Sequence, residues 1–95
     1  MVPPVEAIRQ AAADTLVRRA VVRAGVFGSV ARGEATADSD VEFLVEFEEG
    51  RTLLDLSGLR LDLCEVLGRE VDVTTSASLH PRLRDRILRE VIRIP

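Results

Sequence analysis

The 95-residue sequence contains no lysine, tyrosine, tryptophan or asparagine, and only one cysteine and one histidine. Without lysine, the chain cannot form a Schiff base with a substrate or build a Walker-type phosphate loop, which requires that residue. The lone Cys64 cannot form a disulfide within the chain, and one cysteine with one histidine cannot make a Cys/His zinc site. Because leucines surround Cys64, we expect a small buried apolar residue rather than a reactive thiol.

The charged residues are also restricted in kind. All thirteen basic residues are arginine, and sixteen acidic residues give a net charge of −3, which argues against general nucleic-acid binding. No apolar run reaches the roughly 18 residues of a membrane span. The beginning, MVPPVEAIRQ, does not resemble a signal peptide. We therefore expect one cytoplasmic domain over residues 1–95, with no membrane segment and no direct nucleic-acid contact.

Hydrophobic spacing predicts alternating helices and strands. Helices are expected from after Pro4 to about Arg19, over residues 52–67 and from Pro81 onward, strands at 21–27, 41–47 and 70–75, and a short helical turn at 28–33. Gly68 is placed to end the second long helix, and Pro81 to begin the last. The order α-β-α-β-α-β-α predicts an α/β (α+β) fold with a small sheet flanked by helices, and a mixed sheet remains open.

The most informative stretch begins where the first strand ends, and it reads GSVARGEATADSDVEFLVEF. Gly28 and Ser29 form a small-residue turn in which backbone N–H groups and a hydroxyl can hold phosphate oxygens. Arg32 can add positive charge to that grip. On the next strand Asp40 and Glu42 share one face, where like charges repel unless a cation lies between them. The stretch indicates a metal-bound nucleotide, although a solvated acidic strand face would explain the two acids taken alone.

A third acid lies on the next strand, where Asp72 stands between Val71 and Val73. Alternation points Asp72 away from the core face of the valines. If the two strands pair, Asp72 reaches the face of Asp40 and Glu42, and three carboxylates can hold two metal ions. An exposed acid at the end of a strand is the simpler alternative for Asp72.

The motif resembles the signature GS-x10-D-x-D of DNA polymerase beta-like nucleotidyltransferases. The short chain and its ending, VDVTTSASLHPRLRDRILREVI, are similar to the minimal nucleotidyltransferase (MNT) antitoxins of HEPN/MNT toxin-antitoxin pairs. The resemblance implies that Gly28 and Ser29 contact the phosphates of ATP. It also implies that Asp40 and position 42 bind two magnesium ions. Asp72 is then the third carboxylate, which helps to deprotonate the acceptor hydroxyl.

The same resemblance implies a reaction, the transfer of AMP from ATP to a tyrosine of a partner HEPN RNase toxin, which neutralises the toxin. Because the chain has no tyrosine, such an acceptor must belong to a partner. Two residues depart from the family's pattern. Glu42 replaces an aspartate and carries its carboxylate about one bond further, although magnesium requires near-octahedral geometry at about 2.0–2.1 Å. Val30 stands where relatives often have a basic residue.

These departures keep other functions open. The first alternative is a catalytically impaired antitoxin that neutralises its toxin by binding alone. The second is a small nucleotide-binding subunit that acts on a small molecule or an RNA end. The absence of an acceptor-binding domain argues against the small molecule, and the acidic net charge argues against RNA.

The last helix carries a stripe of arginines opposite its apolar face. The stripe consists of Arg82, Arg86, Arg89 and Arg93, and the apolar face of Leu83, Ile87, Leu88 and Val91. A solvated helix face and a contact with an acidic partner or a nucleotide are both compatible with this stripe. His80 is expected to begin the helix rather than to act as a catalytic base. Asp55 and Asp62 are expected to be ordinary surface residues.

Overall fold

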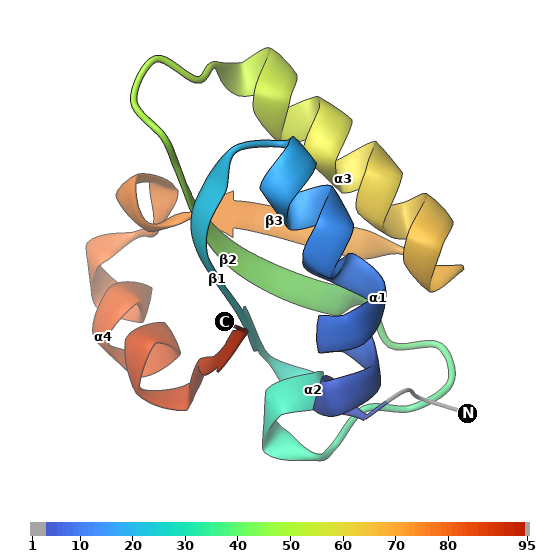
Figure 1. The fold of residues 1–95 in the computed structure, drawn as a ribbon. Helices are drawn as coiled ribbons and strands as arrows, with labels where there is room; N and C mark the ends of the chain where they lie inside the picture. Colours follow the sequence, from blue (N-terminus) through green and yellow to red (C-terminus); the bar gives the residue numbers. More distant parts are fainter. Residues whose placement is uncertain (1–3, 95) are drawn as a thin grey trace.

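Helices and strands alternate within residues 4–94, the part of the chain that the computed structural model describes (Figure 1). The elements are α1 (Val5–Arg18), β1 (Val21–Phe27), α2 (Ser29–Arg32), β2 (Val41–Phe47), α3 (Leu53–Leu67), β3 (Val71–Thr75), the 3-10 turn η1 (Ser76–Ser78), α4 (Pro81–Glu90) and β4 (Ile92–Ile94). None of the described helices has the length and apolar character needed to cross a membrane.

The four strands form one mixed sheet in the order β3-β2-β1-β4. Strands β2 and β3 run parallel, while β1 is antiparallel to both β2 and β4. Helices α1 and α3 lie side by side on one face, and α4 lies on the opposite side of β1 and β2 (Figure 1). The expectation of a small sheet flanked by helices is confirmed. The sequence left open whether the strands are all parallel or mixed in direction, and the sheet is mixed.

The core lies between the sheet and the pair α1 and α3. Alternation along β2 buries Val41, Phe43 and Val45, which are at most 1% exposed, and turns Glu42 and Glu46 to the other face. The buried cluster consists of Ile8, Ala12, Leu16, Ala24, Val26, Val30, Val41, Phe43, Val45, Leu59, Leu63, Val71 and Ile94. Cys64 packs against this cluster as a half-buried residue. One face of the sheet is thus closed by α1 and α3, and the other face carries Glu42 and Glu46 on either side of Leu44, which is 7% exposed.

Capping residues define both ends of helix α3. Thr52 and Asp55 form a capping box, in which Asp55 Oδ2 accepts a hydrogen bond of 2.8 Å from the backbone N–H of Thr52. Gly68 ends the helix at a φ of 65°, as expected. The expectation that Asp55 is an ordinary surface residue is therefore wrong, because its carboxylate caps the helix.

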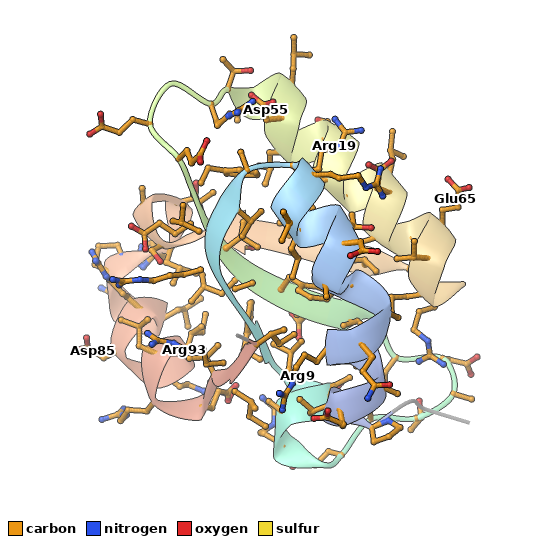
Figure 2. The ribbon with its side chains drawn as sticks, viewed as in Figure 1. Arg9, Arg19, Asp55, Glu65, Asp85 and Arg93 are labelled. Carbon is orange, nitrogen blue, oxygen red and sulfur yellow. The ribbon has the colours of Figure 1, made fainter. Side chains whose placement is uncertain are left out.

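The second acid of this helix also has a structural partner. Asp62 Oδ2 accepts a 2.8 Å hydrogen bond from Arg19 Nε, which ties α3 to the end of α1. Figure 2 shows Arg19 reaching from α1 toward α3. The hydrogen bond from Arg19 is the main reason that the pKa of Asp62 lies below its usual value. Asp62 therefore differs from the ordinary surface residue that the sequence suggested.

The C-terminal segment corrects the expected last helix. Helix α4 ends at Glu90, and Val91 has extended angles, φ −62° and ψ 134°. The next three residues form β4, which pairs with β1 and places Ile94, 3% exposed, in the core. Branched side chains favour a strand here, and pairing satisfies the backbone groups of β1. Val91 and Arg93 consequently lie outside the helix to which the periodicity assigned them.

Candidate active site

The turn after β1 brings Gly28 against the side chain of Glu42. Gly28 has φ 74° and ψ −150°, a region that glycine alone adopts readily. A methyl group built at Gly28 would overlap Glu42 Oε2, so the carboxylate lies directly on the bare α-carbon. The register of β1 and β2, which pairs Phe27 with Glu42, produces this approach. Gly28 is therefore required for its backbone angles and for its missing side chain.

Glu42 and Asp72 lie beside each other across the sheet. They are paired in the parallel register of β2 and β3, and paired residues point to the same face. Burial is the main cause that raises the pKa of half-buried Glu42, and the negative charge of Asp72 raises it further. The smaller contribution of Arg32 opposes this rise. The strand pairing on which the Asp72 prediction depended is present.

Asp40 comes directly before β2 and is exposed. Its charge contributes less than that of Asp72 to the raised pKa of Glu42. Within residues 4–94, no three Asp, Glu, His or Cys side chains are gathered closely enough to hold a metal ion. The oxygen donors of these three acids suit magnesium by their chemistry. Their side chains would have to move together to surround an ion, since only Glu42 and Asp72 are paired in the register.

Arg32, the expected phosphate contact, is bound to two carboxylates. Its Nε donates to Glu34 Oε1 at 2.8 Å, and its Nη1 donates to Glu90 Oε1 at 2.9 Å and to Oε2 at 3.2 Å. The Glu90 side chain is only 19% exposed. Glu90 was not among the candidate residues, and no local pattern marks it, because its role depends on where the end of α4 meets the turn after β1.

An open cleft of about 240 Å³ lies between this turn and α4. It is lined by Phe27, Gly28, Arg32, Glu42, Leu83, Arg86, Ile87 and Glu90. Of the arginine stripe, Arg86 lines the cleft. His80 caps α4, because its Nδ1 accepts a 3.1 Å hydrogen bond from the backbone N–H of Arg82, as expected for a residue that begins the helix. The arrangement can hold an anionic ligand between Gly28 and arginine side chains, beside a pair of carboxylates.

Comparison with known proteins gives consistent results. Residues 7–94 match the family model of the nucleotidyltransferase domain. A Methanocaldococcus jannaschii protein classed as a protein adenylyltransferase is 54% identical over 77 residues, which are 81% of this chain and 83% of the relative.

Two solved structures extend the comparison. One, of a protein classed as a minimal nucleotidyltransferase, is 50% identical and covers 95% of each chain with a TM-score of 0.82. The other is a complex of a tri-AMPylated Shewanella oneidensis HEPN toxin with an MNT antitoxin, in which the similar chain is 14% identical. That match covers 95% of this chain and 71% of the other, with a TM-score of 0.73, and it shows a likeness of fold.

Proposed function

The chain belongs to the nucleotidyltransferase domain family, and from this premise we propose that it is a protein adenylyltransferase that acts as the antitoxin of a HEPN toxin. The observation that carries the proposal is the contact of Gly28 with Glu42, beside Asp72 in the parallel register. A phosphate-binding turn and a carboxylate pair are thereby joined on one open face. The adenylyltransferase relative and the MNT–HEPN complex support the substrate and the partner.

The proposed substrate is ATP, held in the cleft between the turn and α4. Backbone N–H groups at Gly28 and Ser29 bind phosphate oxygens, and Arg86 adds positive charge from the opposite wall. Arg32 also binds a phosphate oxygen, after its Nη1 has given up its hydrogen bonds to Glu90. Two magnesium ions, held by Asp40, Glu42 and Asp72, would neutralise phosphate charge and activate the attacking oxygen.

The proposed reaction is an in-line displacement at the α-phosphorus of ATP. The oxygen of a tyrosine hydroxyl on the toxin forms a bond to the α-phosphorus, and the bond from that phosphorus to the bridging oxygen breaks. Pyrophosphate leaves with the electron pair of the broken bond, and the exposed carboxylate of Asp72 accepts the proton of the hydroxyl. Because this chain contains no tyrosine, the acceptor belongs to the partner. We place the reaction in the cytoplasm, where ATP is supplied.

A second candidate function, neutralisation of the toxin by binding alone, is favoured by the position of Glu42. Its carboxylate lies on Gly28, and no three acids converge within the described residues. In this case the domain only binds the toxin, and no ATP is consumed.

The test mixes the purified chain with ATP, magnesium chloride and the HEPN-domain protein encoded beside it, and records the intact mass of both proteins. We expect added AMP on the partner, located on a tyrosine by fragmentation, and no added mass with the matched Asp72→Asn variant. A stable complex without any adduct would overturn adenylyl transfer and establish the second candidate.

A further inference from the structure

A second cavity lies between α4 and the sheet, and it shares no residue with the cleft at Gly28. Its volume is about 150 Å³. The residues that form its floor and walls are Gly25, Leu44, Ser76, Leu88, Val91 and Arg93. An apolar cavity of roughly this volume holds a molecule the size of benzene. The second cavity can therefore take one aliphatic or phenyl-sized side chain.

The strand register forms the floor of the second cavity. Gly25 is paired with Leu44 on β2 and with Arg93 on β4, so these three positions make one row across the sheet. Val91 packs against the bare α-carbon of Gly25, because a methyl group built there would lie 2.6 Å from Val91 Cγ2. Leu44 is only 7% exposed, whereas Leu88 on α4 is 44% exposed. The second cavity thus has an apolar floor and an apolar wall that is only partly covered.

This row lies directly beside the pair of carboxylates. Glu42 and Leu44 are two residues apart on β2 and point to the same face, so that roughly 7 Å separates the two positions. Gly28 follows Phe27, the partner of Glu42 in the register, and lies on the side of the carboxylates away from Leu44. Along this face of the sheet, the phosphate-binding turn, the carboxylates and the second cavity therefore follow one another in that order.

The order defines the side from which an acceptor arrives, provided that AMP is transferred as proposed above. In an in-line displacement, the attacking oxygen approaches opposite the leaving group. Because pyrophosphate is held at the turn of Gly28, the acceptor hydroxyl comes from the side of the second cavity. The acceptor belongs to another protein, since this chain has no tyrosine. The polypeptide that carries the acceptor consequently passes over the row of Leu44 and Gly25.

Two arginines give the second cavity a positive rim. Arg23 and Glu46 both line it, and they form only a loose pair at 3.8 Å. Arg93 is exposed, and within residues 4–94 its guanidinium forms no ion pair. Figure 2 shows Arg93 beside α4. A carboxylate on an incoming polypeptide would complement this rim.

We propose that the second cavity is a specificity pocket for the acceptor protein, and that it binds the apolar side chain two residues away from the acceptor tyrosine. In an extended segment, such side chains point to the same side and lie roughly 7 Å apart, which equals the spacing of Glu42 and Leu44. The tyrosine then reaches Asp72 while its neighbour enters the second cavity, and Arg93 pairs with an acidic residue beside it. The base of ATP fits this space less well, because a purine is larger than benzene.

The first test fills the second cavity. Ser76→Phe places a ring at its wall, and Ala77→Phe is the matched control, because Ala77 is exposed in the same 3-10 turn and lines neither the second cavity nor the cleft. Rates of AMP transfer are measured at varied concentrations of ATP and of the HEPN-domain protein encoded beside the chain. For Ser76→Phe, we expect KM for the partner protein to rise about tenfold and KM for ATP to stay unchanged. Circular dichroism verifies that both variants are folded.

The outcomes separate the specificity pocket from the transfer reaction itself. A wild-type chain that gives no adduct overturns the proposed function, and the specificity pocket with it. If the wild-type chain transfers AMP but Ser76→Phe behaves like Ala77→Phe, the specificity pocket alone is overturned. A rise in KM for ATP with Ser76→Phe would assign the second cavity to the nucleotide and would equally contradict the proposal.

The second test identifies the side chain that enters the second cavity. Once fragmentation has located the modified tyrosine, the partner residues one and two positions to each side are replaced by alanine, one at a time. Loss of one residue two positions away should raise KM for the wild-type chain, but should have little further effect with Ser76→Phe, since the two changes remove the same contact. The residues directly beside the tyrosine point to the other side and are the controls. Additive effects at every position would contradict a direct contact.

The third test concerns the charge at the rim. Arg93→Gln should raise KM for the partner protein about threefold and weaken its dependence on salt. Arg89→Gln is the matched control with the same loss of charge, because Arg89 is exposed on α4 and lines neither the second cavity nor the cleft. Equal effects of the two substitutions would mean that the partner responds only to overall charge, and would exclude an ion pair at the second cavity.

Discussion

Arg32 Nη1 lies 2.9 Å from Glu90 Oε1, so that one guanidinium joins the turn after β1 to the last residue of α4. The same arginine holds Glu34 through its Nε at 2.8 Å. Two carboxylates therefore neutralise the charge that the sequence assigned to phosphate binding. The contact also fixes α4 as one wall of the cleft, since Arg86 and Ile87 line that cleft together with Glu90.

Replacing Glu90 should make ATP bind more tightly. In Glu90→Gln, Arg32 loses an ionic partner and the cleft loses a negative charge, so we expect the dissociation constant of ATP to fall about threefold. Isothermal titration calorimetry measures the change. Glu46→Gln is the control with the same loss of charge, because Glu46 is exposed and lies outside this cleft. Weaker binding in Glu90→Gln would instead mean that Glu90 orients Arg32 toward the phosphate.

The pairing of Glu42 with Asp72 illustrates what could be predicted from the sequence. Alternation within each strand is a local property, and it correctly placed both acids on the face opposite the buried valines. The Gly28 turn and the cap at Gly68 were equally local, because a positive φ is needed at each. Whether Asp40, Glu42 and Asp72 share metal ions remains a prediction.

Glu90, Asp62 and β4 show what could not be predicted. Glu90 contacts Arg32 and Asp62 contacts Arg19 across 58 and 43 positions of the sequence, so neither contact leaves a periodic signal. Residues 92–94 continue the helical spacing of apolar side chains, yet pairing with β1 and burial of Ile94 make them a strand. Tertiary contacts therefore overrode the local pattern at β4, whereas at Glu90 and Asp62 there was no local pattern to read.

Asp72→Asn should abolish transfer without preventing the binding of ATP. The amide keeps the size of the side chain but cannot accept the proton of the acceptor hydroxyl, so we expect a loss on the order of 100-fold or more. The rate is measured from intact mass of the partner over time, and ATP binding from calorimetry. A variant that keeps its rate would assign the proton acceptor to another group.

Glu42→Gln should stabilise the metal-free protein at neutral pH. Burial and the charge of Asp72 raise the pKa of Glu42, so ionisation of Glu42 costs free energy in the folded state. A raised acid pKa favours the folded state below the unfolded value, about 4.3, and this contribution is lost as pH rises through the folded pKa. The glutamine variant avoids that loss. Its gain should be of the order of 0.5 kcal/mol at pH 7, discounted for solvent screening.

Urea unfolding at several pH values, with a chelator present, measures this difference in the free energy of unfolding. The advantage of the glutamine variant should shrink as the pH falls below the folded pKa, because the wild-type side chain is then neutral as well. Glu46→Gln should show no comparable advantage, since Glu46 is exposed and pairs only loosely with Arg23 at 3.8 Å. An advantage that does not change with pH would attribute the effect to packing instead of charge.

The contact between Gly28 and Glu42 makes a prediction for a double-mutant cycle. Gly28→Ala should cost about 2–3 kcal/mol of folding free energy, since its backbone angles suit glycine and its methyl group overlaps Glu42 Oε2. Glu42→Asp shortens the side chain and should recover about 1 kcal/mol of that loss. Gly33→Ala is the matched control, because Gly33 has a φ of 73° but open space around a methyl group. Glu42→Asp should therefore leave the cost of Gly33→Ala unchanged, and recovery at both glycines would refute a direct contact.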